Sequence, residues 1–150
     1  MNDEMQDTKA WLQRYFYEKK ELAARKRKLA VIENRLGSGV ARYEDDGTKC
    51  FDTDAARQRH EDALADYSGQ QNRVEEQARK VYAIYTQITE AIEELDDPDH
   101  RLVAMDRYIF RLKWNDIAEL EHISRAQVFR YHGRMLEKMA KIRKSRRFDT

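Results

Sequence analysis

Apolar residues recur in alternating steps of three and four along residues 64–95, and this regularity limits the folds open to the chain more than any other feature. The repeating positions are Leu64, Tyr67, Gln71, Val74, Ala78, Val81, Tyr85, Ile88, Ile92 and Leu95. The spacing predicts a helix with one apolar stripe in the heptad pattern of a coiled coil. Gln71 is the polar member of this stripe, and a polar residue there can fix the register of paired helices.

Residues 8–36 carry a second stripe of the same kind and contain neither Gly nor Pro. Its members are Leu12, Tyr15, Leu22, Leu29, Ile32 and Leu36. The Gly-Ser-Gly sequence that follows predicts the end of this helix, with residues 37–52 as a flexible connection and a further helix over 53–96. We therefore expect a long antiparallel coiled-coil hairpin over residues 1–96.

The two expected helices differ in length. At about 1.5 Å per residue the first runs roughly 43 Å and the second roughly 64 Å. The apolar stripe from Tyr85 to Leu95 must then be covered by something other than the first helix. It could pack on the C-terminal part of the chain or on a second subunit, so a homodimer through the coiled coil remains open.

The composition favours long solvated helices over a sheet. Charged residues make up 38% of the chain, which has 5 glycines and 1 proline, and we expect an all-α fold. The single cysteine, Cys50, excludes an internal disulfide and a cysteine-rich zinc site and favours a reducing, intracellular setting. With neither a bilayer-spanning apolar run nor a signal-peptide pattern, a cytoplasmic protein without a membrane partner is expected.

Charge is distributed unevenly along the chain. Residues 98–150 contain 13 Lys or Arg and 7 Asp or Glu, a net +6, whereas residues 1–97 contain 16 and 21, a net −5. Such asymmetry points to a nucleic-acid surface in the C-terminal part. A separate basic run at residues 25–28 is explained by a solvated helix face or by a supporting DNA contact.

The C-terminal part, residues 97–142, should form a small domain of three helices. Asp97 is suited to cap the first of these, because Pro98 follows at the first helical position. The helix should continue to Phe110. Its inward-facing residues should be Leu102, Met105, Ile109 and Leu112.

A second helix is expected at residues 114–120. Ser124 and Gln127 have the spacing of a capping box, so a third helix should begin at Ser124. So short a turn makes the two helices cross steeply, as in a helix-turn-helix, and Ala118 is small enough for the point where they touch. The core of this pair should contain Ile117, Leu120, Ile123, Val128 and Tyr131.

The third helix has two unlike faces. Placed at about 100° per residue, its inward side contains Val128, His132, Met135, Met139 and Ile142. Arg125 and Arg130 lie outward, and we expect them to read bases, because a guanidinium can bond guanine O6 and N7 together. Gly133 is explained either by a tolerated weakness of the helix or by close approach of its backbone to DNA.

Polar and basic residues along the same helix should bind phosphates. These predicted contacts are Ser124, Gln127, Arg134, Lys138 and Lys141. Residues 143–150 should form a basic tail that adds to them.

The segment RYIFRLKWNDIAELEHISRAQVFRYHGRMLEKM resembles the promoter-recognising C-terminal domain of bacterial sigma factors. It is more similar still to phage late-gene transcriptional regulators of the ArpU/RinA type. The pieces LGSG and LDDPDHR extend the resemblance over most of the chain, although its coiled-coil part is mainly shared periodicity. The resemblance implies a phage or prophage protein that acts on late-gene promoters in a bacterial host cell. The coiled coil would either dimerise it or contact host RNA polymerase.

The same resemblance assigns roles to residues. It places Trp114, Ile117 and Ala118 in the scaffold helix. The residues that fall where sigma factors touch the bases of promoter DNA are Arg125, Ala126, Phe129 and Arg130.

Three positions depart from the pattern of these families. His122 and Arg111 stand where glycine is frequent, in turns that can require a positive φ, which histidine tolerates better than most residues. Ala126 is small where sigma factors often carry a carboxylate, so the base preference of those proteins does not transfer directly.

Catalysis and metal binding find little support. The four histidines have no ligand spacing with carboxylates or with Cys50, and helix capping explains the acidic residues at 96–99. We see no phosphate-binding glycine loop or paired nucleophile and base. We therefore predict no enzyme and no cofactor, but a regulator that binds double-stranded DNA. The alternatives are a DNA-packaging adaptor of the small-terminase kind and a coiled-coil protein-interaction module.

Overall fold

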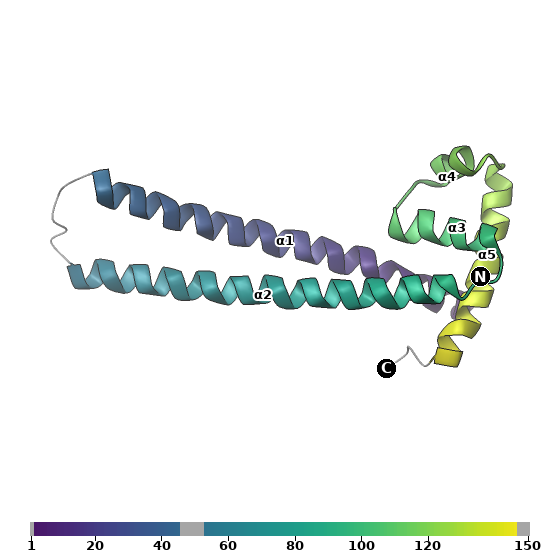
Figure 1. Cartoon of the computed structure of the whole chain (residues 1–150), viewed down its shortest axis with the longest axis horizontal. Helices are drawn as coiled ribbons and strands as arrows, with labels where there is room; N and C mark the ends of the chain where they lie inside the picture. Colours follow the sequence, from purple (N-terminus) through teal and green to yellow (C-terminus); the bar gives the residue numbers. More distant parts are fainter. Residues whose placement is uncertain (1, 46–52, 147–150) are drawn as a thin grey trace. The chain divides into compact units, whose positions relative to one another are not determined.

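The chain is all-α (Figure 1). The computed structural model describes residues 2–45 and 53–146, with side chains at 2–37 and 54–146. Its elements are α1 (Asp3–Asp45), α2 (Thr53–Glu93), α3 (Pro98–Ala104), the π-helix η1 (Met105–Ile109), α4 (Trp114–Glu121) and α5 (Arg125–Arg146). No strand is found over these ranges, and none of these helices is long and apolar enough to cross a bilayer.

Helix α1 is longer than its sequence predicts. It has 43 residues and continues past Gly37 to Asp45, so the predicted helix end at the Gly-Ser-Gly sequence is wrong. A glycine inside a helix costs about 1 kcal/mol and ends it only where the chain reverses in a left-handed conformation. Helix α2 has 41 residues, so the predicted mismatch in length does not exist. The remaining connection, residues 46–52 with Cys50, lies outside the described residues.

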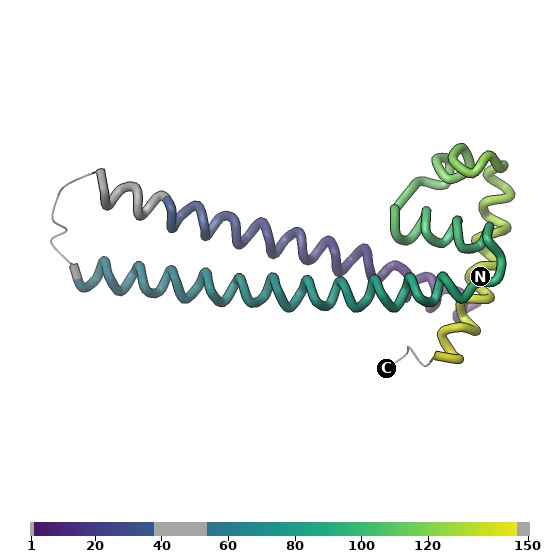
Figure 2. The backbone as a smooth tube through the Cα atoms, in the orientation of Figure 1, coloured from purple at the N-terminus to yellow at the C-terminus, as the bar shows by residue number. Residues whose placement is uncertain are grey.

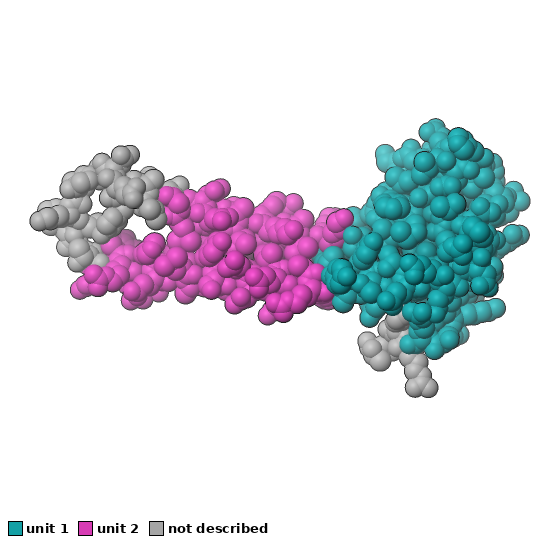
Figure 3. Space-filling view, in the orientation of Figure 1, with its two compact units in different colours: residues 1–18, 81–150 teal, residues 19–80 magenta. Residues whose placement is uncertain are grey.

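The chain divides into two compact units (Figure 3). Unit 1 comprises residues 1–18 and 81–150, and unit 2 comprises residues 19–80. The C-terminal helices therefore share a unit with the beginning of α1 and the end of α2, and the chain does not divide at residue 96 as we expected.

The core of unit 1 joins these segments. It contains Trp11 and Leu12 from α1, four residues from the end of α2, Leu95 just after α2, and residues of the C-terminal helices. The α2 residues are Ile84, Ile88, Ala91 and Ile92, and those of the C-terminal helices are Ala104, Tyr108, Met135, Leu136 and Met139. The sequence left two possibilities for what packs on the end of α2, the C-terminal part of the chain or a second subunit. In the structure the C-terminal part of the chain packs there.

In unit 2 the two helical segments, residues 19–37 and 54–80, run side by side (Figure 2). Part of the predicted α2 stripe is displaced by one residue. Leu64 and Gln71 are exposed, whereas Gln70, which precedes Gln71, and Gln77, which precedes the predicted Ala78, are buried. Adjacent candidates on a helix differ by only about 100°, so the pattern could not choose between them.

A second small core holds α3, α4 and α5 together within unit 1. Val103, Ile117 and Val128 are fully enclosed, and the partly buried residues around them include Leu112, Ala118, Ile123 and Tyr131. Leu102 and Leu120, predicted to be in the core, are 43% and 57% exposed.

The helix that begins at Pro98 ends in a wider turn. Phe110 N–H donates to the Met105 carbonyl at 3.0 Å, five residues back, which defines the π-turn. Such a turn shifts the phase of the helix by about one residue. Asp106 and Tyr108 are consequently buried, whereas the predicted Met105 and Ile109 are only partly buried.

Candidate nucleic-acid interface

The turn between α4 and α5 contains three residues, His122 to Ser124, and is fixed by backbone hydrogen bonds. His122 has φ 56° and lies in the left-handed region, as predicted. Its N–H donates to Glu119 O at 3.3 Å, and Ile123 N–H donates to Ala118 O at 3.1 Å. These bonds satisfy carbonyls at the end of α4.

Both predicted helix starts are confirmed. Gln127 N–H donates to Ser124 Oγ at 3.1 Å, which caps α5. Asp99 N–H donates to Asp97 Oδ1 at 2.9 Å, with Pro98 at the start of α3. The bond to Asp99 N–H is the main cause that lowers the pKa of Asp97.

Helix α5 presents one buried and one exposed side. Val128, His132, Met135 and Met139 are buried and Ile142 is partly buried, as the sequence predicts. Leu136 and Ala140 are buried as well, so the apolar stripe is wider than we predicted. This broad stripe ties the whole of α5 into unit 1 and leaves its opposite side in solvent.

The predicted base-contacting residues share that solvent side. Arg125, Ala126 and Arg130 are exposed, and Phe129 is 43% exposed. They stand in the first two turns of α5, at a spacing that puts them on one face. The Arg125 guanidinium lies 5.4 Å from the centre of the Phe129 ring, so these two side chains adjoin.

The predicted phosphate-contacting residues begin at the same place and continue along α5. Ser124, Arg134, Lys138 and Lys141 are exposed, and Gln127 is partly buried. Residues 130, 134 and 138 are four apart, so they follow one side of the helix. Arg134 and Lys138 lie near His100, and burial first and these cations next lower the pKa of that histidine.

Phe129 has an intramolecular role that we did not predict. Its ring centroid lies 5.1 Å from that of Trp114, which in turn lies 4.7 Å from that of His132. The Arg107 guanidinium covers Trp114 at 4.2 Å. Trp114 thus connects the start of α4 to α5, so Phe129 has only part of its ring available to a ligand.

Beneath this surface, Tyr108 and His132 form a buried pair whose Oη and Nε2 are 2.6 Å apart. Burial is the main cause that lowers the pKa of His132 to about 4 and raises that of Tyr108. Both groups are therefore neutral at pH 7, and the tautomer of the imidazole sets which of the two atoms donates the hydrogen bond. The pair links η1 to α5 without a charge.

The predicted basic tail is partly wrong, because α5 continues to Arg146 and its last basic residues bind elsewhere in unit 1. Arg143 Nη1 donates to Thr8 Oγ1 at 3.1 Å, and Lys144 pairs with Glu4. Arg146 pairs with Glu94 and, at 3.6 Å, with Glu90. These three cations therefore stabilise the fold of unit 1. Residues 147–150 lie outside the described residues.

Among the side chains that the structure describes, no group of three or more His, Cys, Asp or Glu is placed to hold a metal ion. The site consists of a capped helix with an exposed basic and apolar face. Comparison with protein-family models, curated proteins and solved structures found no match to this chain.

Proposed function

We propose that the chain is a sequence-specific double-stranded DNA-binding transcription regulator in which α4 and α5 form a helix-turn-helix. The observation that carries the proposal is the division of α5 into two sides. A broad apolar stripe holds the helix, while Arg125, Ala126, Phe129 and Arg130 project from its first two turns. A recognition helix meets the base edges of the major groove with these N-terminal turns.

Each exposed residue has a definite role in this proposal. Arg125 and Arg130 bond guanine O6 and N7, and the small Ala126 and the free edge of Phe129 contact thymine methyl groups. Further contacts fix the position of the helix on the phosphates without reading sequence. These come from Ser124, Gln127, Arg134, Lys138 and Lys141.

The proposal also includes the long helices α1 and α2. Helices α1 and α2 form an antiparallel coiled-coil hairpin, and the C-terminal helices form a sigma-like domain. The resemblance to ArpU/RinA-type regulators adds a phage or prophage origin, action at late-gene promoters in the bacterial cytoplasm, and host RNA polymerase as a partner. The proposal needs no cofactor and no catalytic residue.

Selection of duplexes from a random DNA pool by the purified full chain, at two salt concentrations, tests the proposal. A sequence reader enriches a motif that persists at the higher salt, because base contacts depend on salt less than phosphate contacts do. Retention of DNA without a motif, lost on adding salt, would show a phosphate binder and contradict sequence-specific regulation.

A second candidate function is a protein-interaction module. A mainly apolar groove of about 530 Å³ lies in unit 1 between the end of α2 and α3, where Tyr85, Ile92, Leu102 and Met105 line it. Nearby, Tyr82 is 71% exposed. If the chain forms a dimer in sedimentation experiments, loss of that dimer in Leu102→Glu would favour this module, and a dimer unaffected by the change would count against it.

A further inference from the structure

Unit 2 places polar residues where two paired helices ordinarily place apolar ones. Gln70 and Gln77 are buried on α2, and Arg25 on α1 is partly buried among side chains directed towards α2. Of the basic run at residues 25–28, Lys26, Arg27 and Lys28 are exposed, as on a solvated helix face, and the Arg25 side chain is 35% exposed. Polar residues in such a seam cost stability, which indicates that they serve a purpose other than packing.

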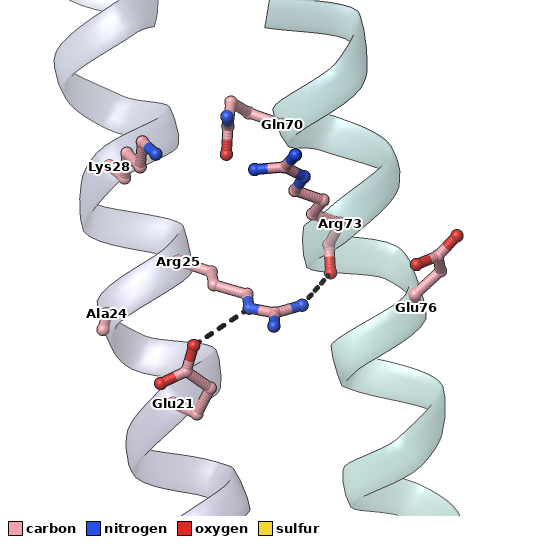
Figure 4. A pocket seen from close by; sticks show the side chains of 7 residues that line it. All are labelled: Glu21, Ala24, Arg25, Lys28, Gln70, Arg73 and Glu76. Carbon is pink, nitrogen blue, oxygen red and sulfur yellow. Dashed lines mark hydrogen bonds and ion pairs between the residues drawn. The ribbon is translucent and has the colours of Figure 1, made fainter.

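Gln70 and Arg25 line a hollow of about 450 Å³ between the helices (Figure 4). Arg25 and Lys28 reach it from α1, and Gln70 and Arg73 reach it from α2. Figure 4 shows the ends of Lys28, Gln70 and Arg73 directed into the space between the ribbons. The hollow is thus lined by three cationic side chains and one amide, together with the carboxylates of Glu21 and Glu76.

The carboxylates at the rim leave two of these cations without an acidic partner. Glu21 Oε1 accepts from Arg25 Nε at 3.1 Å, and Glu76 points away from the gap in Figure 4. Arg25 uses another nitrogen, Nη1, to donate to the Arg73 carbonyl at 3.3 Å. Among the described residues, the Lys28 ammonium and the Arg73 guanidinium have no hydrogen bond or ion pair.

We propose that this hollow binds a phosphate group. A tetrahedral oxyanion offers several acceptors, which suit a guanidinium fork, an ammonium and an amide N–H arriving from different directions. Its negative charge also offsets the repulsion among Arg25, Lys28 and Arg73, of which, among the described side chains, only Arg25 is paired with a carboxylate, that of Glu21.

The phosphate can be free in solution or part of a nucleic-acid backbone. Around the hollow, residues 19–37 of α1 contain 7 Lys or Arg and 2 Asp or Glu. Lys26, Arg27 and Arg35 are among the exposed ones. An extended basic face is suited to successive phosphates of a strand. The phosphate site itself does not rest on DNA recognition by α5, because all of its residues belong to unit 2.

Titration of the isotopically labelled full chain with inorganic phosphate tests the site, with sodium chloride adjusted to hold ionic strength constant. We expect saturable shifts of the Arg25 and Arg73 side-chain Nε–Hε signals in NMR spectra. Arg73→Ala should weaken phosphate binding about tenfold. Arg79→Ala is the matched control, because this arginine is on the same helix, is exposed and pairs with Glu75.

Lys28→Ala should also weaken phosphate binding, and it leaves α2 unchanged. Circular dichroism shows whether each variant keeps its helix content. Shifts that rise linearly without saturating, or that chloride reproduces, would overturn the proposal. An equal loss of phosphate binding in Arg73→Ala and Arg79→Ala would do so too.

Fluorescence anisotropy with a labelled duplex then identifies the source of the phosphate. If a nucleic-acid backbone supplies it, Arg73→Ala lowers affinity for every duplex alike, and Arg79→Ala does not. If the phosphate is free, Arg73→Ala leaves duplex affinity unchanged while the phosphate titration still saturates. Because the titration contains no DNA, its outcome is independent of whether α5 binds a promoter.

Discussion

The two units of this chain bury their side chains differently, although both are built from α1 and α2. Unit 1 encloses apolar residues such as Leu12, Ile88 and Met135 completely. In unit 2, the only buried side chains among the described residues are Gln70 and Gln77. Two helices alone leave most of each surface in solvent, whereas in unit 1 the C-terminal helices cover the remaining apolar faces. Stability should therefore be concentrated in unit 1, beneath α5.

The largest expected difference between the units is in the free energy of unfolding lost on truncation, comparing Ile88→Ala with Leu64→Ala. Ile88 is fully buried in unit 1, so its truncation should lower the free energy of unfolding by about 2 to 5 kcal/mol. Leu64 is 47% exposed in unit 2, and its truncation should cost less than about 1 kcal/mol. Urea unfolding measures both. Equal losses would contradict the contrast between the units.

The buried His132 makes the stability of unit 1 depend on pH. Its pKa is about 4 in the folded protein and 6.5 in the unfolded chain, so the unfolded state binds more protons between these values. The stabilising effect of the neutral imidazole is fully present above pH 6.5. The free energy of unfolding falls by about 3 kcal/mol on acidification to pH 4. The acid-induced loss should shrink in His132→Gln; an unchanged profile would show that this histidine is not the cause.

Asp106 acts in the opposite direction. Burial first and Glu121 next raise its pKa to about 6, above its ordinary 3.8, so its charged form destabilises the fold at pH 8 and this cost disappears below pH 4. Asp106→Asn should raise stability by about 1 to 3 kcal/mol at pH 8 and by little at pH 4. Thermal unfolding at the two pH values measures the gain, and a variant less stable at both would refute this explanation.

Ser124→Ala gives a smaller effect. Loss of the bond from Gln127 N–H should cost about 1 kcal/mol. Ser145→Ala, an exposed change near the other end of α5, is the control and should cost almost nothing. Chemical denaturation of the two variants compares them; equal stability would mean that the cap contributes nothing measurable.

Much of the candidate site could be predicted from sequence because its determinants are local. A cap such as Ser124 or Asp97 depends on a few neighbouring residues, and so does the left-handed conformation at His122. The inward side of α5 was predictable because its apolar spacing is regular.

The failures arise where the outcome depends on residues far away in sequence or on small energy differences. The ion pairs of Arg146 join residues more than 50 positions apart, so the sequence gives no sign that this end of α5 is engaged. The π-turn at Met105 shifts burial by one residue, and the glycines after Leu36 weaken α1 without ending it.

The most direct test of base reading compares Arg130→Ala with Lys141→Ala on the selected duplex and on unrelated duplexes. Arg130→Ala should cost about 1 to 3 kcal/mol on the selected site and relax the preference at one base pair. Lys141→Ala should weaken all duplexes alike and reduce the slope of log affinity against log salt by about 1. Equal losses from both variants on every duplex would contradict recognition of base edges by α5.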